Sequence, residues 1–171
     1  MKKLTLLSAL LIFACGSDSA DNDSNITQNV LIVNGQEYPI SRGVLQLVMG
    51  DSGDEVYQNL IFGQSTLPDN LFCGDYLYQG YYIDIAYQSN TSDGTGVFTD
   101  VFGDYDLFFD STNQDEENFT VFGDNDNVSS ALSVTKSGNI YTVELNTVDE
   151  NGNSVEVYYN GANINIYECG F

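Results

Sequence analysis

Carboxylates are the abundant side chains of this sequence that could carry out acid–base or metal chemistry. The 171 residues include 25 Asp and Glu, three Cys and no His. Without histidine, Ser-His-Asp and Cys-His catalysis and histidine-ligated zinc or haem are excluded. Two carboxylates can hydrolyse a glycan, but among 25 acidic residues some pair lies close together by chance. Because the chain also lacks the Trp of typical sugar platforms, we expect a protein that is not an enzyme.

Clusters of Asp and Asn beside glycines indicate calcium as the metal to consider, because hard oxygen ligands suit Ca²⁺. The same clusters are typical of plain turns, so calcium is an optional ligand and no cofactor is required. The candidate ligands are Asp100, Asp104 and Asp106 around Gly103, Asp124 and Asp126 with Asn127 after Gly123, and a third group of Asp149, Asn151 and Asn153. None of these clusters has the spacing of an EF-hand loop.

Two tyrosines are candidates for a ligand platform. Tyr82 and Tyr158 alternate with apolar residues and share strand faces with Asp84 and Glu156. If those faces are solvated, both rings are exposed and available to a ligand. The alternative is that they pack across strands, as Tyr commonly does.

These candidates lie in short alternating apolar runs separated by Gly, Asn and Asp, which is typical of β-strands. The pattern predicts an all-β fold: an antiparallel meander of about ten short strands that closes as a β-sandwich or as an up-and-down, lipocalin-like barrel. Both closures bury one face of each strand, so the sequence leaves the choice open. The expected strands are 30–33, 44–48 and 56–62 as a hairpin, 81–87, 97–102, 106–109, 119–122, 128–135, 140–160 as a hairpin, and 163–167.

The first 15 residues have a different character. Lys2 and Lys3 precede an apolar run at 4–13, which is the pattern of a secretory signal and is too short to span a bilayer. The segment that ends Ile12-Phe13-Ala14-Cys15 resembles the lipobox of bacterial lipoproteins. The resemblance implies a signal peptide at 1–14 and a lipid on Cys15, and hence a membrane anchor.

The resemblance also indicates how the rest of the chain is organised. Residues 15–29 are polar and acidic and predict a flexible tether, and residues 30–171 predict a single β domain. If Cys15 carries lipid, Cys73 and Cys169 are the remaining cysteines in an oxidising compartment, and we expect a disulfide between them. Together with the terminal Tyr-x-Val hairpin, this organisation resembles small β-rich envelope lipoproteins.

Charge limits the partners. After Lys2 and Lys3, the chain has only Arg42 and Lys136 against 25 acidic residues. Such a surface repels phosphate, so no nucleic-acid partner is expected. We expect an outer-membrane lipoprotein of the cell envelope, facing either the periplasm or the surface, that acts as a non-enzymatic binding or adhesion module for a glycan or a protein. The alternatives are a barrel that carries a small apolar ligand, and a carboxylate-type glycan hydrolase with two acidic groups facing each other in a cleft.

The lipid anchor gives the first testable prediction. Cys15→Ser removes the predicted acylation site, so the protein should leave the membrane fraction while its β domain stays folded, as measured by fractionation and circular dichroism. Ser19→Ala, four residues further on, is the control and should stay with the membranes. A Cys15→Ser protein that remains membrane-bound contradicts the lipoprotein assignment.

Overall fold

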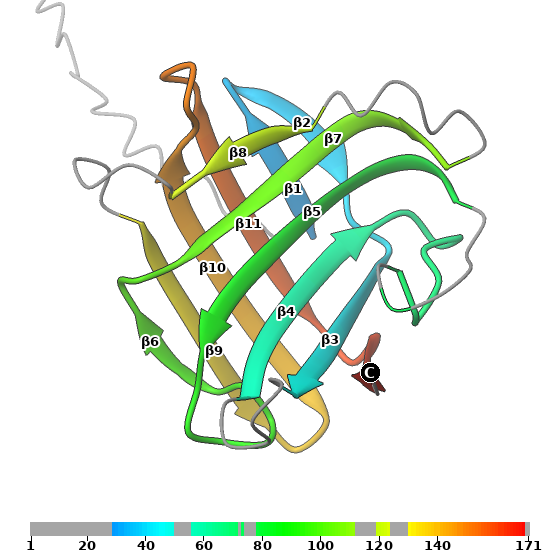
Figure 1. The fold of residues 1–171 in the computed structure, drawn as a ribbon, viewed down its shortest axis with the longest axis vertical. Helices are drawn as coiled ribbons and strands as arrows, with labels where there is room; N and C mark the ends of the chain where they lie inside the picture. The colour runs from blue at the N-terminus through cyan, green and yellow to red at the C-terminus, as the bar shows by residue number, and fades with distance from the viewer. Residues whose placement is uncertain are drawn as a thin grey trace, which may run out of the picture.

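The part of the chain that the structure describes folds as a β-sandwich of two six-stranded sheets. The computed structural model describes residues 29–49, 56–71, 73, 78–111, 119–123 and 130–169. Figure 1 shows the strands β8, β7, β5, β4 and β3 crossing in front of β9, β10 and β11. The all-β prediction is confirmed, and of the two closures left open the sheets form a sandwich and not a closed barrel. In the described ranges, no helix is long and apolar enough to cross a membrane.

We call the two layers sheet I and sheet II. In spatial order, sheet I contains β2 (Gln36–Pro39), β1 (Val30–Val33), β11 (Ser154–Gly161), β10 (Ile140–Val148), β9 (Ala131–Ser137) and β6 (Gly96–Phe98). Sheet II contains β12 (Ile164–Cys169), β3 (Arg42–Met49), β4 (Val56–Gly63), β5 (Gln79–Gln88), β7 (Phe102–Asp110) and β8 (Thr120–Phe122).

The core lies between the sheets and comes from the alternation of each strand. Successive side chains of a strand point to opposite faces, so β5 directs Ile83, Ile85 and Tyr87 inward, where all three are buried. They pack in one cluster with the inward residues of sheet I, such as Val143 and Val157. The outward positions of β5 belong to the opposite face of sheet II.

Two predicted hairpins are confirmed, but the simple antiparallel meander is wrong: non-consecutive strands pair in both sheets, such as β1 with β11 and β5 with β7, and one pair is parallel. β10 pairs with β11 over the predicted 140–160 hairpin, and β3 pairs with β4. The last strand, β12, pairs parallel with β3. Both strands enter sheet II directly from a strand of sheet I, β3 after β2 and β12 after β11, and the backbone N–H of Gly43 bonds to the carbonyl of Asn163 where they start. They therefore run side by side in the same direction.

Other boundaries differ from the prediction. β2 was not expected, although Asn34 and Gly35 both have positive φ and form the tight turn that leads into it. In place of the strand expected at 97–102, the structure has the shorter strand β6, which ends at Phe98. The strand expected at 106–109 begins earlier: it is β7, which starts at Phe102. Gly103 therefore lies inside a strand and not in a turn.

The outer face of sheet II is covered over part of its area. We call residues 64–71, 73 and 78, which precede β5, the cover. Leu67, Leu71 and Tyr78 of the cover are buried against Val44 and Ile61 on the outer face. Without the cover these apolar strand residues would be exposed to water, so the segment forms a second, smaller core.

Polar contacts attach the cover to β3. The Arg42 guanidinium donates to the carbonyl of Leu67 and forms an ion pair with Asp69. The Gln46 amide donates to the carbonyl of Leu71. One of the few basic residues of the chain is thus used to hold the cover.

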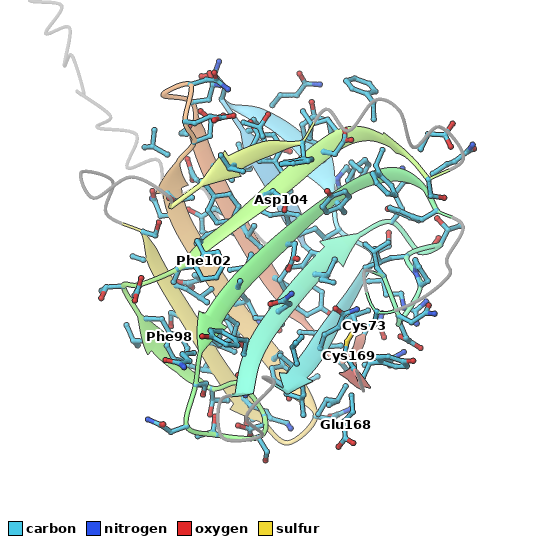
Figure 2. All side chains as sticks on the ribbon, viewed as in Figure 1. Cys73, Phe98, Phe102, Asp104, Glu168 and Cys169 are labelled. Carbon is cyan, nitrogen blue, oxygen red and sulfur yellow. A yellow bond between two sulfur atoms is a disulfide. The ribbon has the colours of Figure 1, made fainter. Side chains whose placement is uncertain are left out.

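The predicted disulfide between Cys73 and Cys169 is present, with Cα atoms 5.6 Å apart. It joins the cover to the last residue of β12, and Figure 2 shows the two cysteines at the edge of sheet II away from Phe102 and Asp104. The bridge closes a sequence separation of 96 residues. In the chain-entropy model, a loop of this length stabilises the fold by about 4 to 5 kcal/mol.

The bridge gives a prediction about stability. The double variant Cys73→Ser, Cys169→Ser should lose about 3 to 5 kcal/mol of unfolding free energy, because its unfolded chain is no longer cross-linked. Urea unfolding measures the loss, and the parent protein in reductant should match the variant. An unchanged midpoint in both samples would show that the bridge does not stabilise the fold.

Candidate functional site

The uncovered part of the outer face of sheet II forms an open groove of about 730 Å³. Most of its lining residues lie on β4, β5, β7 and β8. The others are Val48 near the end of β3, Asp100 just before β7 and Gly123 just after β8. The lining residues are Val48, Tyr57, Asn59, Asp84, Ala86, Asp100, Phe102, Gly103, Asp104, Val121, Phe122 and Gly123. The groove thus has an apolar and aromatic surround with a few polar groups, which is typical of ligand sites.

The polar centre of the groove is set by strand register. Asp84 of β5 pairs directly with Asp104 of β7, and Val121 of β8 follows in the same row. Directly opposed side chains of an antiparallel pair have Cβ atoms about 4.5 to 5.5 Å apart. Asn59 of β4 adds an amide whose Nδ2 lies 3.4 Å from Asp84 Oδ2. Two carboxylates and an amide therefore meet on one small area of the sheet.

The pKa of Asp84 is strongly perturbed at this centre. Asp84 Oδ1 is buried and has no hydrogen-bond partner in the part of the chain that the structure describes. Burial, followed by the negative charge of Asp104, raises the pKa of Asp84 well above its usual value, with a smaller opposing effect of the Ile85 backbone N–H. Asp84 therefore holds its proton to a higher pH than a solvated Asp.

Aromatic side chains flank the carboxylates. Phe102 is next to Ala86 in the β5–β7 register and is 49% exposed, and Tyr57 of β4 is 37% exposed. Large aromatic rings usually bury most of their surface in a fold. These two rings are open to a ligand on the same face as Asp84 and Asp104.

The three residues of the first predicted calcium cluster have different surroundings. Asp100 is exposed at the groove, Asp104 lies opposite Asp84, and Asp106 accepts a hydrogen bond from the Phe108 backbone N–H at 2.7 Å. Burial raises the pKa of Asp106. Within the described ranges, no group of three or more acidic or Cys side chains is placed to hold a metal ion. Asp124 and Asp126 of the second cluster, like Cys15, lie outside the described residues.

The third cluster has a structural role. Asp149 is 2% exposed and accepts hydrogen bonds from the Tyr105 hydroxyl, from the backbone N–H groups of Asn151 and Asn153, and from the Asn153 side chain. Burial opposes ionisation, but these bonds outweigh it and lower the pKa of Asp149. The carboxylate thus closes the β10–β11 turn and links sheet I to Tyr105 of sheet II.

The ligand platform expected at Tyr82 is wrong, and Tyr158 has a structural partner. Tyr82 is only 3% exposed, because Phe109 packs against it edge to face at a centroid distance of 5.2 Å and the cover joins the same cluster. Its hydroxyl bonds to Asp104, and burial and that carboxylate raise the pKa of Tyr82. Tyr158 is half-buried on the far sheet and donates to Glu156 at 3.0 Å.

The sequence prediction did not identify Asp84, Asn59, Tyr57 or Phe102 as site residues. The available signal was the alternation at 81–87, which places Asp84 on the face opposite the core residues Ile83 and Ile85. Asp104 is a calcium candidate in the sequence, but its pairing with Asp84 is not predicted, because Gly103-Asp104 has the composition of a turn. A Cβ on Gly103 would lie 2.0 Å from the Asp84 carbonyl oxygen, so this glycine serves close strand contact.

Comparison with known proteins adds no precedent for this groove. No protein-family model matches the chain, and neither a curated protein nor a solved structure matches it. The geometry of the groove is therefore the basis for inferring the function.

The buried carboxyl predicts an unusual dependence of stability on pH. As the pH rises above the ordinary value of 3.8, Asp84 ionises in the unfolded chain but keeps its proton in the folded one. The folded state then binds more protons, so stability falls with pH until the raised pKa is passed. Asp84→Asn removes this loss and should be more stable than the parent at neutral pH by about 1 to 3 kcal/mol.

Urea unfolding of both proteins from pH 4 to pH 8 tests this dependence. The difference between variant and parent should grow with pH and then level off. Asp100→Asn removes the same charge from an exposed position of the groove and is the matched control. An Asp84→Asn protein that is less stable than the parent at every pH would show that the carboxylate is well accommodated.

Proposed function

We propose that this protein is a lipid-anchored protein of the bacterial cell envelope whose β-sandwich binds a saccharide in the groove of sheet II. The N-terminal resemblance to lipoproteins supports the anchor. The observation that carries the ligand class is the pairing of exposed aromatic rings, Tyr57 and Phe102, with the carboxylates of Asp84 and Asp104 in one groove. The apolar face of a sugar ring can pack on an aromatic ring while its hydroxyls donate to carboxylate oxygens.

The form of the groove supports an extended ligand. Its floor is the outer face of a sheet and runs across β4, β5, β7 and β8. A binding surface of this kind on a rigid sheet is organised before the ligand arrives, which lowers the entropic cost of binding. The alternative of an apolar ligand inside a barrel lacks the architecture it requires, since the sheets do not close into a barrel.

Hydrolysis of a bound glycan is the second candidate function, and one observation favours it. Glycosidases use two carboxyl groups on either side of the scissile bond, one of them with a raised pKa. Asp84 and Asp104 face each other across neighbouring strands, and the pKa of Asp84 is raised by burial and by the charge of Asp104. Binding without turnover remains our first proposal because the protein has neither His nor Trp.

A glycan array probed with the purified protein tests the proposal. We expect a restricted set of saccharides to bind, and Phe102→Ala to weaken binding about tenfold, which corresponds to about 1.4 kcal/mol. Phe108→Ala is the matched control, because Phe108 also lies on β7 and is 88% exposed but does not line the groove.

Each other outcome has a definite meaning. Silence across the array, or equal losses in both variants, would contradict saccharide binding in this groove. Release of new reducing ends from a bound glycan, abolished by both Asp84→Asn and Asp104→Asn, would favour the hydrolase over the binding module.

A further inference from the structure

The described lining of the groove is acidic and contains no basic residue. Asp84, Asp100 and Asp104 line it. The basic residues that follow Lys3 are held elsewhere: Arg42 pairs with Asp69 beneath the cover, and Lys136 lies 3.9 Å from Asp93 on the far sheet. No cation of the described chain neutralises the groove, so its field attracts cationic ligands and repels anionic ones.

The surroundings of Asp84 give a more specific reason than net negative charge for the groove to bind a cation. Asp84 Oδ1 is buried and, among the described residues, has no hydrogen-bond partner, although the residue lines the groove. The donor near its other oxygen is the Asn59 amide, at 3.4 Å. A buried carboxylate oxygen without a donor is costly unless the carboxyl holds a proton or meets a cation. The pair of Asp84 and Asp104 is thus arranged to accept either one.

The aromatic rings of the groove point to the kind of cation. An ammonium group over the face of Tyr or Phe gains a cation–π attraction. Tyr57 and Phe102 present exposed rings beside the carboxylates. Strongly hydrated metal ions prefer a cage of several oxygen ligands, and no such group of acidic side chains is present in the described part of the chain. An organic amine fits this combination better than a metal ion.

We infer that the ligand is a saccharide bearing a protonated amine, with its ammonium group over Asp84 and Asp104, and that binding displaces the proton shared by these carboxyls. The inference rests on the proposed saccharide binding and names the class of saccharide. The ammonium N–H groups donate to the carboxylate oxygens, and the displaced proton passes to the solvent. The positive charge of the ammonium group thus replaces that of the displaced proton.

Other polar and titratable groups lie near the pair of Asp84 and Asp104. On β4, Asn59 is a neighbour of Asp84 and Tyr57 lines the same groove, and on β5 the neighbour is the Tyr82 hydroxyl. β7 adds Asp106, which pairs with Tyr82 in the strand register and bonds to a backbone N–H, while β8 places the uncharged Val121 beside Asp104. Asp100 lies at the groove. Within the described residues, Asp84 Oδ1 is a buried oxygen without a hydrogen bond, and so is Asp104 Oδ1, although Asp104 also bonds to the Tyr82 hydroxyl.

Isothermal titration calorimetry with two matched probes tests the inference. The full chain is titrated with a glucosamine tetramer and with the N-acetylglucosamine tetramer, which has neutral amides in place of the amines. The titrations use a mildly acidic pH, at which the amines are protonated, and two buffers of different ionisation enthalpy. We expect the glucosamine tetramer to bind at least about tenfold more tightly than the N-acetylglucosamine tetramer. Its affinity should fall with added salt, and its binding should release up to about one proton from the protein.

Variants then assign the proton. Asp84→Asn should abolish proton release and remove most of the preference for the amine. Asp100→Asn, which removes an equal charge from the same groove, should weaken binding by no more than a few fold and keep the proton release. Proton release that persists in Asp84→Asn would overturn the assignment to this pair.

The inference and the proposed function fail in different ways. Equal binding of the two tetramers without proton release would overturn the amine specificity and leave saccharide binding in place. Silence of both tetramers, with neutral glycans bound on the array, would do the same. Silence of both tetramers and of the whole array would refute both proposals.

Discussion

The register between β5 and β7 is the constraint on which the groove depends. It places Ile83 opposite Tyr105 in the core and, one residue along, Asp84 opposite Asp104 on the outer face. Because the side-chain period of a strand is two, a slip of one residue in either strand would move the carboxylate of that strand into the core. The apolar inward residues of β5 forbid that slip, and Gly103 allows the two backbones to approach at this point. The core of the sandwich thus positions the polar pair.

The outer face of sheet II is divided by the same alternation into two parts with different solvation. Around Val44 and Ile61 it is apolar and must be covered, which Leu67 and Leu71 do. The described residues of the cover form no strand or helix, and Arg42, Gln46 and the disulfide attach them to sheet II. Around Asp84 the face is polar and is left as a groove. One sheet therefore provides a second small core and a binding surface side by side.

The sequence predicted what depends on local pattern and missed what depends on pairing. Alternation and an Asn-Gly turn predicted the 140–160 hairpin, and the cysteines left after Cys15 predicted the disulfide; both are present. The same local reasoning failed at Gly103-Asp104, where a turn composition lies inside β7 because Gly103 is needed for close packing against β5. For Tyr82 the sequence leaves both a solvated face and packing across strands open, and the cover that buries the ring comes from residues up to 18 positions earlier in the chain. Such contacts leave no periodic signal in either segment.

The contrast between Asp149 and Asp84 shows why the groove carboxylates call for a ligand. Asp149 is buried and ionisable, and the fold supplies it with donors from Tyr105, Asn151 and Asn153, so that its pKa falls. This is how the protein accommodates a carboxylate whose role is structural. Asp84 is opposed by a like charge, which destabilises an antiparallel pair, and its Oδ1 has no donor within the described residues. Local rules of stability are broken chiefly at functional sites. The contrast between Asp149 and Asp84 within one small domain therefore places the functional demand on the face of sheet II and leaves the β10–β11 turn to the fold.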